Sequence, residues 1–133
     1  MIVGTFDLQM GEVDGYHLCA PTSYWQASQE EIEEHTGGCG PGKLGDWFIP
    51  DTMLGESVHL ACEIHDWCYH AGQTLQDKFT ADLLFLVNMV ILVNDGDMLD
   101  ALRLRRCMTY FQAVSMGGEE AFKKGKDNVD DLA

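Results

Sequence analysis

The most informative segment of this sequence is Ala61-Cys62-Glu63-Ile64-His65-Asp66-Trp67-Cys68-Tyr69, in which a polar His-Asp pair stands between apolar residues. It lies within residues 56–72, which are predicted to form a helix that ends at a glycine. In a helix of 3.6 residues per turn, His65 and Tyr69 share a face, and Asp66 lies about 100° around from His65. His65 and Asp66 can therefore border one cleft. The alternative is a surface pair or a satisfied buried pair, which is the commoner state of a lone His-Asp dipeptide.

A glycine-rich segment, Gly37-Gly38-Cys39-Gly40-Pro41-Gly42, precedes this helix. Glycine and proline favour turns and positive φ angles, so we expect the segment to end the preceding helix and to form a shaped loop. Closely spaced backbone carbonyls together with a carboxylate make an oxygen cage that suits calcium, a hard cation. The loop and the carboxylate of Asp66 are therefore more informative together than the His-Asp pair is alone.

Further helices follow from periodicity and from capping residues. One is expected from Pro21–Ser23 to His35, with its glutamates on the solvated face. Another is expected over about 76–94 and a last one over about 98–117, because the turn-prone Asn94-Asp95-Gly96-Asp97 separates them.

The two ends of the chain show little regular pattern. Residues 1–20 have no sustained helical period and are interpreted as an irregular arm or a short strand pair. Residues 123–133 are charged and are interpreted as a frayed tail. A chain of 133 residues is long enough for one compact domain and short for two, so we expect a single domain over residues 1–133.

The composition is strongly acidic, with 8 basic against 22 acidic residues and a formal net charge of -14. Affinity for phosphate backbones depends on clustered lysine and arginine, so nucleic acid is not an expected partner and anionic membranes would repel the chain. Calcium and zwitterionic or apolar interfaces remain compatible with this charge.

The sequence features that bear on the location of the protein in or outside the cell disagree with one another. The longest apolar stretch, Leu83 to Val93, has 11 residues, roughly half of what a bilayer requires, so it is interpreted as a buried helix and no transmembrane segment is expected. No basic residue precedes Lys43, and no signal peptide is visible. Five cysteines nevertheless suggest disulfides, and hence a secreted, virion-associated or otherwise exported protein. The localisation therefore stays unknown.

Three motifs together resemble a known family: GGCGPG at 37–42, ACEIHDWCY at 61–69 and TADLLFL at 80–86. The combination is similar to the secreted phospholipase A2 superfamily, which joins a Cys-Gly-x-Gly calcium loop to a Cys-x-x-His-Asp-x-Cys-Tyr helix. The short gap before Asp82 is more similar to the prokaryotic and parvoviral branches than to venom enzymes. The resemblance spans residues 37–89.

The fold that this resemblance implies is mainly α. It has two antiparallel core helices at about 56–72 and 76–94, a glycine-rich calcium loop, and disulfide cross-links. Cys39 and Cys62 match the bridge between the loop and the catalytic helix. Cys68 also matches a family cysteine, but its usual partner position is occupied by alanine, so Cys107 is the substitute that we expect. Zinc is the rival explanation of the cysteines, yet no Cys-x-x-Cys pair is present.

The resemblance also implies a metal site. The backbone carbonyls of Gly38, Gly40 and Gly42 and the carboxylate of Asp66 would hold Ca²⁺, with water in the remaining positions. Calcium would polarise the ester carbonyl, and the Gly40 amide would be a second donor to the developing oxyanion.

The catalytic residues implied by the resemblance are His65 and Asp82. His65 would take a proton from the attacking water, and Asp82 would accept a hydrogen bond from the other ring nitrogen and fix the tautomer. Tyr69, one turn after His65, would steady Asp82. The alternative for Asp82 is a solvated carboxylate, but its apolar neighbours favour a buried position that needs a partner.

The implied function is calcium-dependent hydrolysis of the sn-2 acyl ester of glycerophospholipids at a membrane or micelle interface. One alternative is a non-catalytic calcium-binding or structural module on the same scaffold, and another is an acyl hydrolase or transferase that acts on a non-phospholipid ester. Five apolar residues lie between the loop and the catalytic helix and form either a lipid-contacting rim or, more commonly, core packing: Trp47, Phe48, Ile49, Met53 and Leu54.

Overall fold

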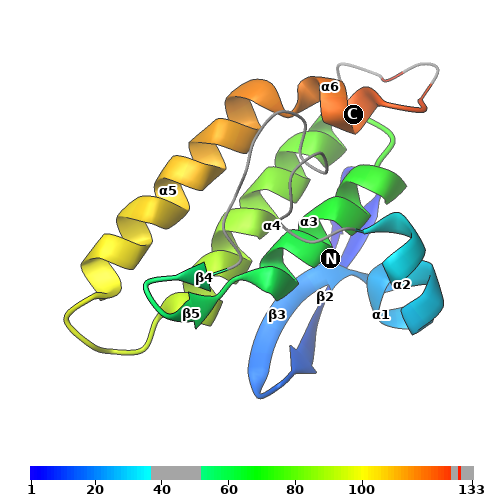
Figure 1. Cartoon of the computed structure of the whole chain (residues 1–133). Helices are drawn as coiled ribbons and strands as arrows, with labels where there is room; N and C mark the ends of the chain where they lie inside the picture. The colour runs from blue at the N-terminus through cyan, green and yellow to red at the C-terminus, as the bar shows by residue number, and fades with distance from the viewer. Residues whose placement is uncertain (37–51, 127–128, 130–133) are drawn as a thin grey trace.

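The computed structural model describes residues 1–36, 52–126 and 129 of the chain (Figure 1). Its strands are β1 (Ile2–Val3), β2 (Phe6–Val13), β3 (Tyr16–Pro21), β4 (Thr52–Met53) and β5 (Glu56–Ser57). Its helices are α1 (Thr22–Gln26), α2 (Gln29–His35), α3 (His59–Ala71), α4 (Leu75–Val93), α5 (Asp100–Gly117) and α6 (Glu119–Lys123).

The fold is mixed α and β. Of the described residues, 60% are helical and 19% lie in two antiparallel sheets, so the prediction of a mainly α fold is wrong. The difference comes from residues 1–20, where β2 pairs with both β1 and β3. Asp14 and Gly15 turn the chain between β2 and β3 with φ angles of 52° and 86°, the positive values that two-residue hairpin turns require.

The predicted cross-link between Cys68 and Cys107 is wrong, because both are free, buried thiols. Burial raises the pKa of each thiol, that of Cys107 to about 11. No disulfide joins two described residues; Cys62 is disulfide-bonded, and its predicted partner Cys39 lies outside the described residues. Cys107 instead places its sulfur 3.7 Å from the sulfur of Met53, because the side of α5 that carries it packs on the β4–β5 hairpin rather than on Cys68.

The predicted helices over 56–72, 76–94 and 98–117 are confirmed as α3, α4 and α5, each within three residues of the expected bounds. The helix expected up to His35 is divided into α1 and α2, because Ser28 starts a new helix. Its hydroxyl accepts from the Glu31 amide while the Glu31 carboxylate accepts from the Ser28 amide, which satisfies two otherwise unpaired amides.

Helix α4 lies at the centre of the molecule and packs against α3, α5 and the N-terminal sheet (Figure 1). Helices α3 and α4 run antiparallel, joined by a short connection at 72–74. The sheet is held to α4 by Asn88, whose side chain accepts from the Cys19 amide at 2.9 Å and donates to the Cys19 carbonyl at 2.8 Å. This central position explains why polar residues of α4 are buried.

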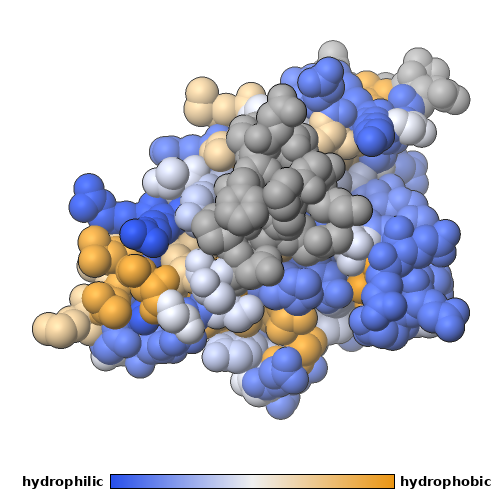
Figure 2. Space-filling view, viewed as in Figure 1, coloured by the Kyte–Doolittle hydropathy of each residue, from blue (hydrophilic) through white to orange (hydrophobic). Residues whose placement is uncertain are grey.

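One face of α4 is more exposed than expected. Phe79, Leu83 and Val87 are about half exposed, so the interpretation of residues 83–93 as a buried helix is wrong for the face that carries Leu83 and Val87. Hydrophilic residues cover the α1–α2 corner, whereas apolar residues gather near the start of α5 (Figure 2). Within the described ranges, no helix combines the length and the apolar character that a bilayer crossing requires.

Candidate functional site

The candidate site is built where α3 and α4 face each other. The ring nitrogen Nε2 of His65 lies 2.8 Å from the Oδ1 atom of Asp82, and the two side chains are 0% and 1% exposed. His65 lies in the middle of α3 and Asp82 in the first half of α4, so the antiparallel packing of the two helices brings them together. The contact predicted between these residues is therefore present, and its catalytic role stays a prediction.

Tyr69 completes the group on α3. Its hydroxyl donates to the same Oδ1 atom of Asp82 at 2.8 Å. Burial, the charge of Asp82, the hydrogen bond to that carboxylate and the charge of Asp66 together raise the pKa of Tyr69. The phenol therefore stays protonated at neutral pH and remains a donor, which is the steadying contact that the resemblance implied.

Sequence reasoning missed a fourth member of the group, Lys78. Its ammonium forms an ion pair with the Oδ2 atom of Asp82 at 2.8 Å and donates hydrogen bonds to the carbonyls of Val114 at 3.0 Å and Ser115 at 2.9 Å. The signal that could have found it is the four-residue spacing between Lys78 and Asp82, which places the two side chains on one face of a helix. Lys78 thus connects the candidate dyad to the C-terminal end of α5.

The arrangement of His65 is suited to proton transfer. The Nε2 atom faces a carboxylate, so it carries the proton in a neutral ring that donates to Asp82. The other ring nitrogen, Nδ1, is buried and has no hydrogen-bond partner within the described part of the chain. A lone pair on Nδ1 is therefore available to accept a proton, while Asp82 is placed to stabilise the imidazolium that would form.

Asp66 follows His65 on α3 and is buried, at 7% exposure. Together with Tyr69 it lines a cavity of about 430 Å³. The three other predicted calcium ligands, Gly38, Gly40 and Gly42, lie outside the described residues, as does the oxyanion role of the Gly40 amide.

The described part of the chain has no group of three or more His, Cys, Asp and Glu side chains that could hold a metal. The predicted cage uses a single carboxylate, Asp66, and backbone carbonyls, so it would not contain such a group. The oxygen donor of Asp66 is of the type that calcium prefers, and the calcium site stays a prediction.

The apolar segment before α3 is only partly described. Trp47, Phe48 and Ile49 lie outside the described residues. Met53 is 1% exposed and belongs to the core, and Leu54 is half-buried. For Met53, the interpretation as core packing is therefore confirmed.

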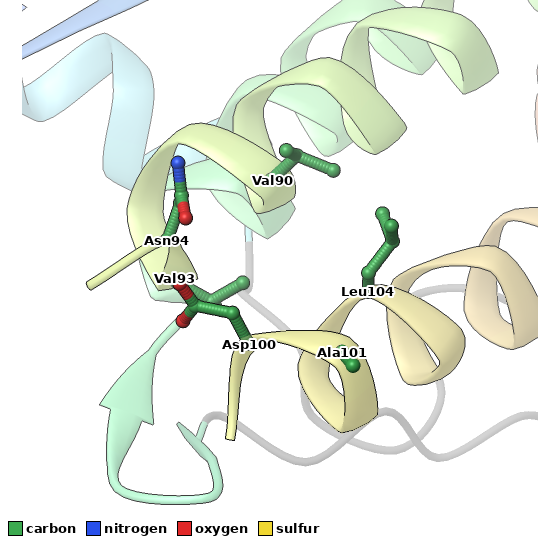
Figure 3. Close-up of a pocket in the computed structure, with 6 residues that line it drawn as sticks. All are labelled: Val90, Val93, Asn94, Asp100, Ala101 and Leu104. Carbon is green, nitrogen blue, oxygen red and sulfur yellow. The ribbon is translucent and has the colours of Figure 1, made fainter. Parts of the chain in front are cut away.

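A second cavity, of about 270 Å³, lies between the C-terminal end of α4 and the N-terminal end of α5 (Figure 3). Its lining is mostly aliphatic, and the carboxylate of Asp100 already accepts hydrogen bonds from the amides of Asp95 and Gly96. Without an available acid, base or nucleophile, this groove is a poor candidate for chemistry.

The candidate site is therefore the buried group of His65, Asp82, Tyr69 and Lys78, with Asp66 at its edge. Comparisons with family models, curated proteins and solved structures give no match for this chain, so the resemblance to phospholipase A2 rests on its sequence motifs alone.

Proposed function

We propose that this protein is a calcium-dependent acyl hydrolase that cleaves the sn-2 ester of glycerophospholipids. The observation that carries the proposal is the 2.8 Å contact between His65 Nε2 and Asp82 in a buried setting, where the Nδ1 atom has no hydrogen-bond partner among the described residues. A general base needs both features, because one nitrogen must be held while the other takes the proton.

In the proposed reaction, His65 accepts a proton at Nδ1 from a water molecule that attacks the ester carbonyl. Asp82 holds the ring in the tautomer that leaves Nδ1 free, and its charge stabilises the imidazolium. Tyr69 and Lys78 occupy the two oxygens of Asp82, which restricts rotation of the carboxylate. The proton then passes from His65 to the leaving alkoxide.

Asp66 is the described residue that would hold calcium, with the carbonyls of Gly38, Gly40 and Gly42 as its predicted partners. A bound calcium ion supplies a Lewis acid for the ester carbonyl and for the oxyanion. The position of Asp66 directly after His65 in the chain supports this proposal, because one helix would then carry both the base and the metal ligand.

A non-catalytic module on the same scaffold is the second candidate. Two observations favour it: the His65 ring is fully buried, and the Lys78 ammonium offsets the negative charge of Asp82. A buried polar network of this kind can serve to specify one packing of two helices.

Fatty-acid release from phosphatidylcholine vesicles, with a label in the sn-2 chain, separates the two candidates. We expect release that requires calcium, stops with EGTA, and falls by about 10² to 10⁴-fold in His65→Gln. The matched control is His59→Gln, which makes the same change at an exposed position of the same helix and should retain activity. Release that is unaffected by His65→Gln would refute the assignment.

Calcium binding is measured separately by titration calorimetry. We expect the protein to bind the ion and Asp66→Asn to lose this binding, because the variant lacks the carboxylate charge. Calcium binding without any turnover of lipid would favour the non-catalytic module.

A further inference from the structure

The cavity beside Asp66 lies between the C-terminal ends of α2 and α3 and the chain around α6. We call it the α2–α6 pocket. Its volume of about 430 Å³ is within the range of small-molecule sites, roughly 300 to 1,000 Å³. Its acidic, histidine and lysine lining residues are Glu34, His35, Asp66, His70, Lys124 and Lys126. The chemistry of this lining suggests what the pocket could bind.

Two histidines line one side of the α2–α6 pocket. The rings of His35 and His70 are stacked, with centroids 3.7 Å apart and planes 10° from parallel. Neither ring makes a hydrogen bond to a described residue, so both offer N–H donors to a ligand. Burial, His35 and Lys126 lower the pKa of His70, and Glu34 raises it by a smaller amount. The lower pKa favours a neutral ring, which can still donate one N–H hydrogen bond.

Two lysines also line the pocket. Lys126 anchors its ammonium on the carbonyls of Tyr69 and Phe122, and one of its three N–H groups remains for a ligand. Burial lowers the pKa of Lys126, as expected for an ammonium that has lost part of its hydration. Lys124 is exposed and forms no ion pair or hydrogen bond with a described residue.

The position of these lysines is unusual for this chain. Only eight lysine and arginine residues occur among 133, and three of them are Lys123, Lys124 and Lys126. Lys124 and Lys126 line the α2–α6 pocket together with Asp66 and Tyr69. Ammonium and imidazole groups therefore converge beside the candidate site in an otherwise strongly acidic protein.

We propose that the α2–α6 pocket binds the phosphate group of the substrate, so that the enzyme acts on phospholipids in preference to neutral esters. Phosphate oxygens accept strong hydrogen bonds from ammonium groups and from imidazole N–H groups. The negative charges of Glu34 and Asp66 would repel a bound anion. In the proposed function, on which the catalytic part of this inference rests, Asp66 holds a cation and its charge is offset.

A binding experiment tests the pocket without turnover. The probe is sn-glycerol 3-phosphate, with glycerol and inorganic phosphate as comparisons, titrated against the full chain by calorimetry with and without calcium. We expect binding of the phosphate ester but not of glycerol, weakened about tenfold by Lys124→Ala and by His70→Gln, which corresponds to the loss of roughly one charge-assisted hydrogen bond. The matched control is Arg105→Ala, which removes one exposed positive charge from α5 and should leave binding unchanged.

A kinetic experiment tests substrate choice. It compares a short-chain phosphatidylcholine below its micelle concentration with the diacylglycerol that carries the same acyl chains. We expect Lys124→Ala and His70→Gln to raise KM for the phospholipid about tenfold, with kcat retained and the diacylglycerol unaffected. A general loss of structure would instead lower activity on both esters.

The outcomes separate the two proposals. If the probe binds as expected but neither ester is hydrolysed, the pocket stands and the proposed function fails. If both esters are hydrolysed and the variants change neither probe binding nor phospholipid KM, the pocket assignment is overturned. Equal binding of inorganic phosphate and glycerol phosphate, with phospholipid KM unchanged in the variants, would indicate a site for free phosphate and would overturn the assignment to substrate.

Discussion

The buried ion pair between Lys78 and Asp82 yields a quantitative prediction for Asp82→Asn. The substitution keeps the shape of the side chain but removes the carboxylate that lies 2.8 Å from the Lys78 ammonium, where both side chains are 1% exposed. An ammonium would then be left unpaired in the protein interior. We expect the free energy of unfolding to fall by about 3 to 5 kcal/mol, a large part of the roughly 5 to 15 kcal/mol that holds a typical domain.

The chain contains a matched control for this change. Glu119 and Lys123 have the same four-residue spacing and a similar separation of 2.7 Å, but their side chains are 57% and 41% exposed. We expect Glu119→Gln to leave the denaturation midpoint almost unchanged, because water screens exposed pairs. The two variants therefore differ mainly in burial.

Urea denaturation followed by circular dichroism measures both variants, and a shift of the midpoint at constant slope reports stability. Adding Lys78→Met to Asp82→Asn should recover most of the loss, because removal of both charges leaves no unpaired ion in the core. The reasoning is refuted if Asp82→Asn costs no more than Glu119→Gln, or if Lys78→Met adds its own cost to that of Asp82→Asn.

Three further predictions concern other parts of the structure. Burial tends to raise the pKa of Asp77, but four hydrogen bonds to its carboxylate lower it. The ionised Asp77 therefore stabilises the fold above about pH 4, the ordinary pKa range of aspartate, and this stabilisation is lost as pH falls through its lower pKa in the folded state. We expect the free energy of unfolding to depend less steeply on pH in Asp77→Asn when it is measured by urea denaturation in acid. Gly118→Ala would place a methyl group against the Tyr69 hydroxyl, so we expect a loss of about 1 to 3 kcal/mol in thermal unfolding, and wild-type stability would contradict this packing. Burial raises the pKa of the Cys68 and Cys107 thiols, so a thiol reagent should label them only after unfolding. If neither thiol is labelled in the unfolded chain without a reductant, the two cysteines are joined by a disulfide and the assignment as free thiols is wrong.

Local pattern was sufficient for much of the helical structure. The bounds of α3, α4 and α5 follow from apolar spacing and from turn residues close in sequence, and the placement of His65 and Asp66 on one helix follows from the same pattern. The sequence also signals the β2–β3 hairpin locally, by Asp14-Gly15 between two strand-like runs, but it does not signal the pairing of β1 with β2.

What the sequence by itself determined is thus the three long helices and the chemistry that each one carries. Tertiary structure decided which groups meet: Lys78 reaches both Asp82 and the end of α5, Cys68 and Cys107 remain apart, and α2, α3 and α6 enclose one cavity. The physical reason is the distance along the sequence over which each kind of interaction acts. Helix periodicity and capping depend on neighbours within about four residues, whereas distances between remote side chains depend on how whole helices pack, and no local pattern specifies that packing.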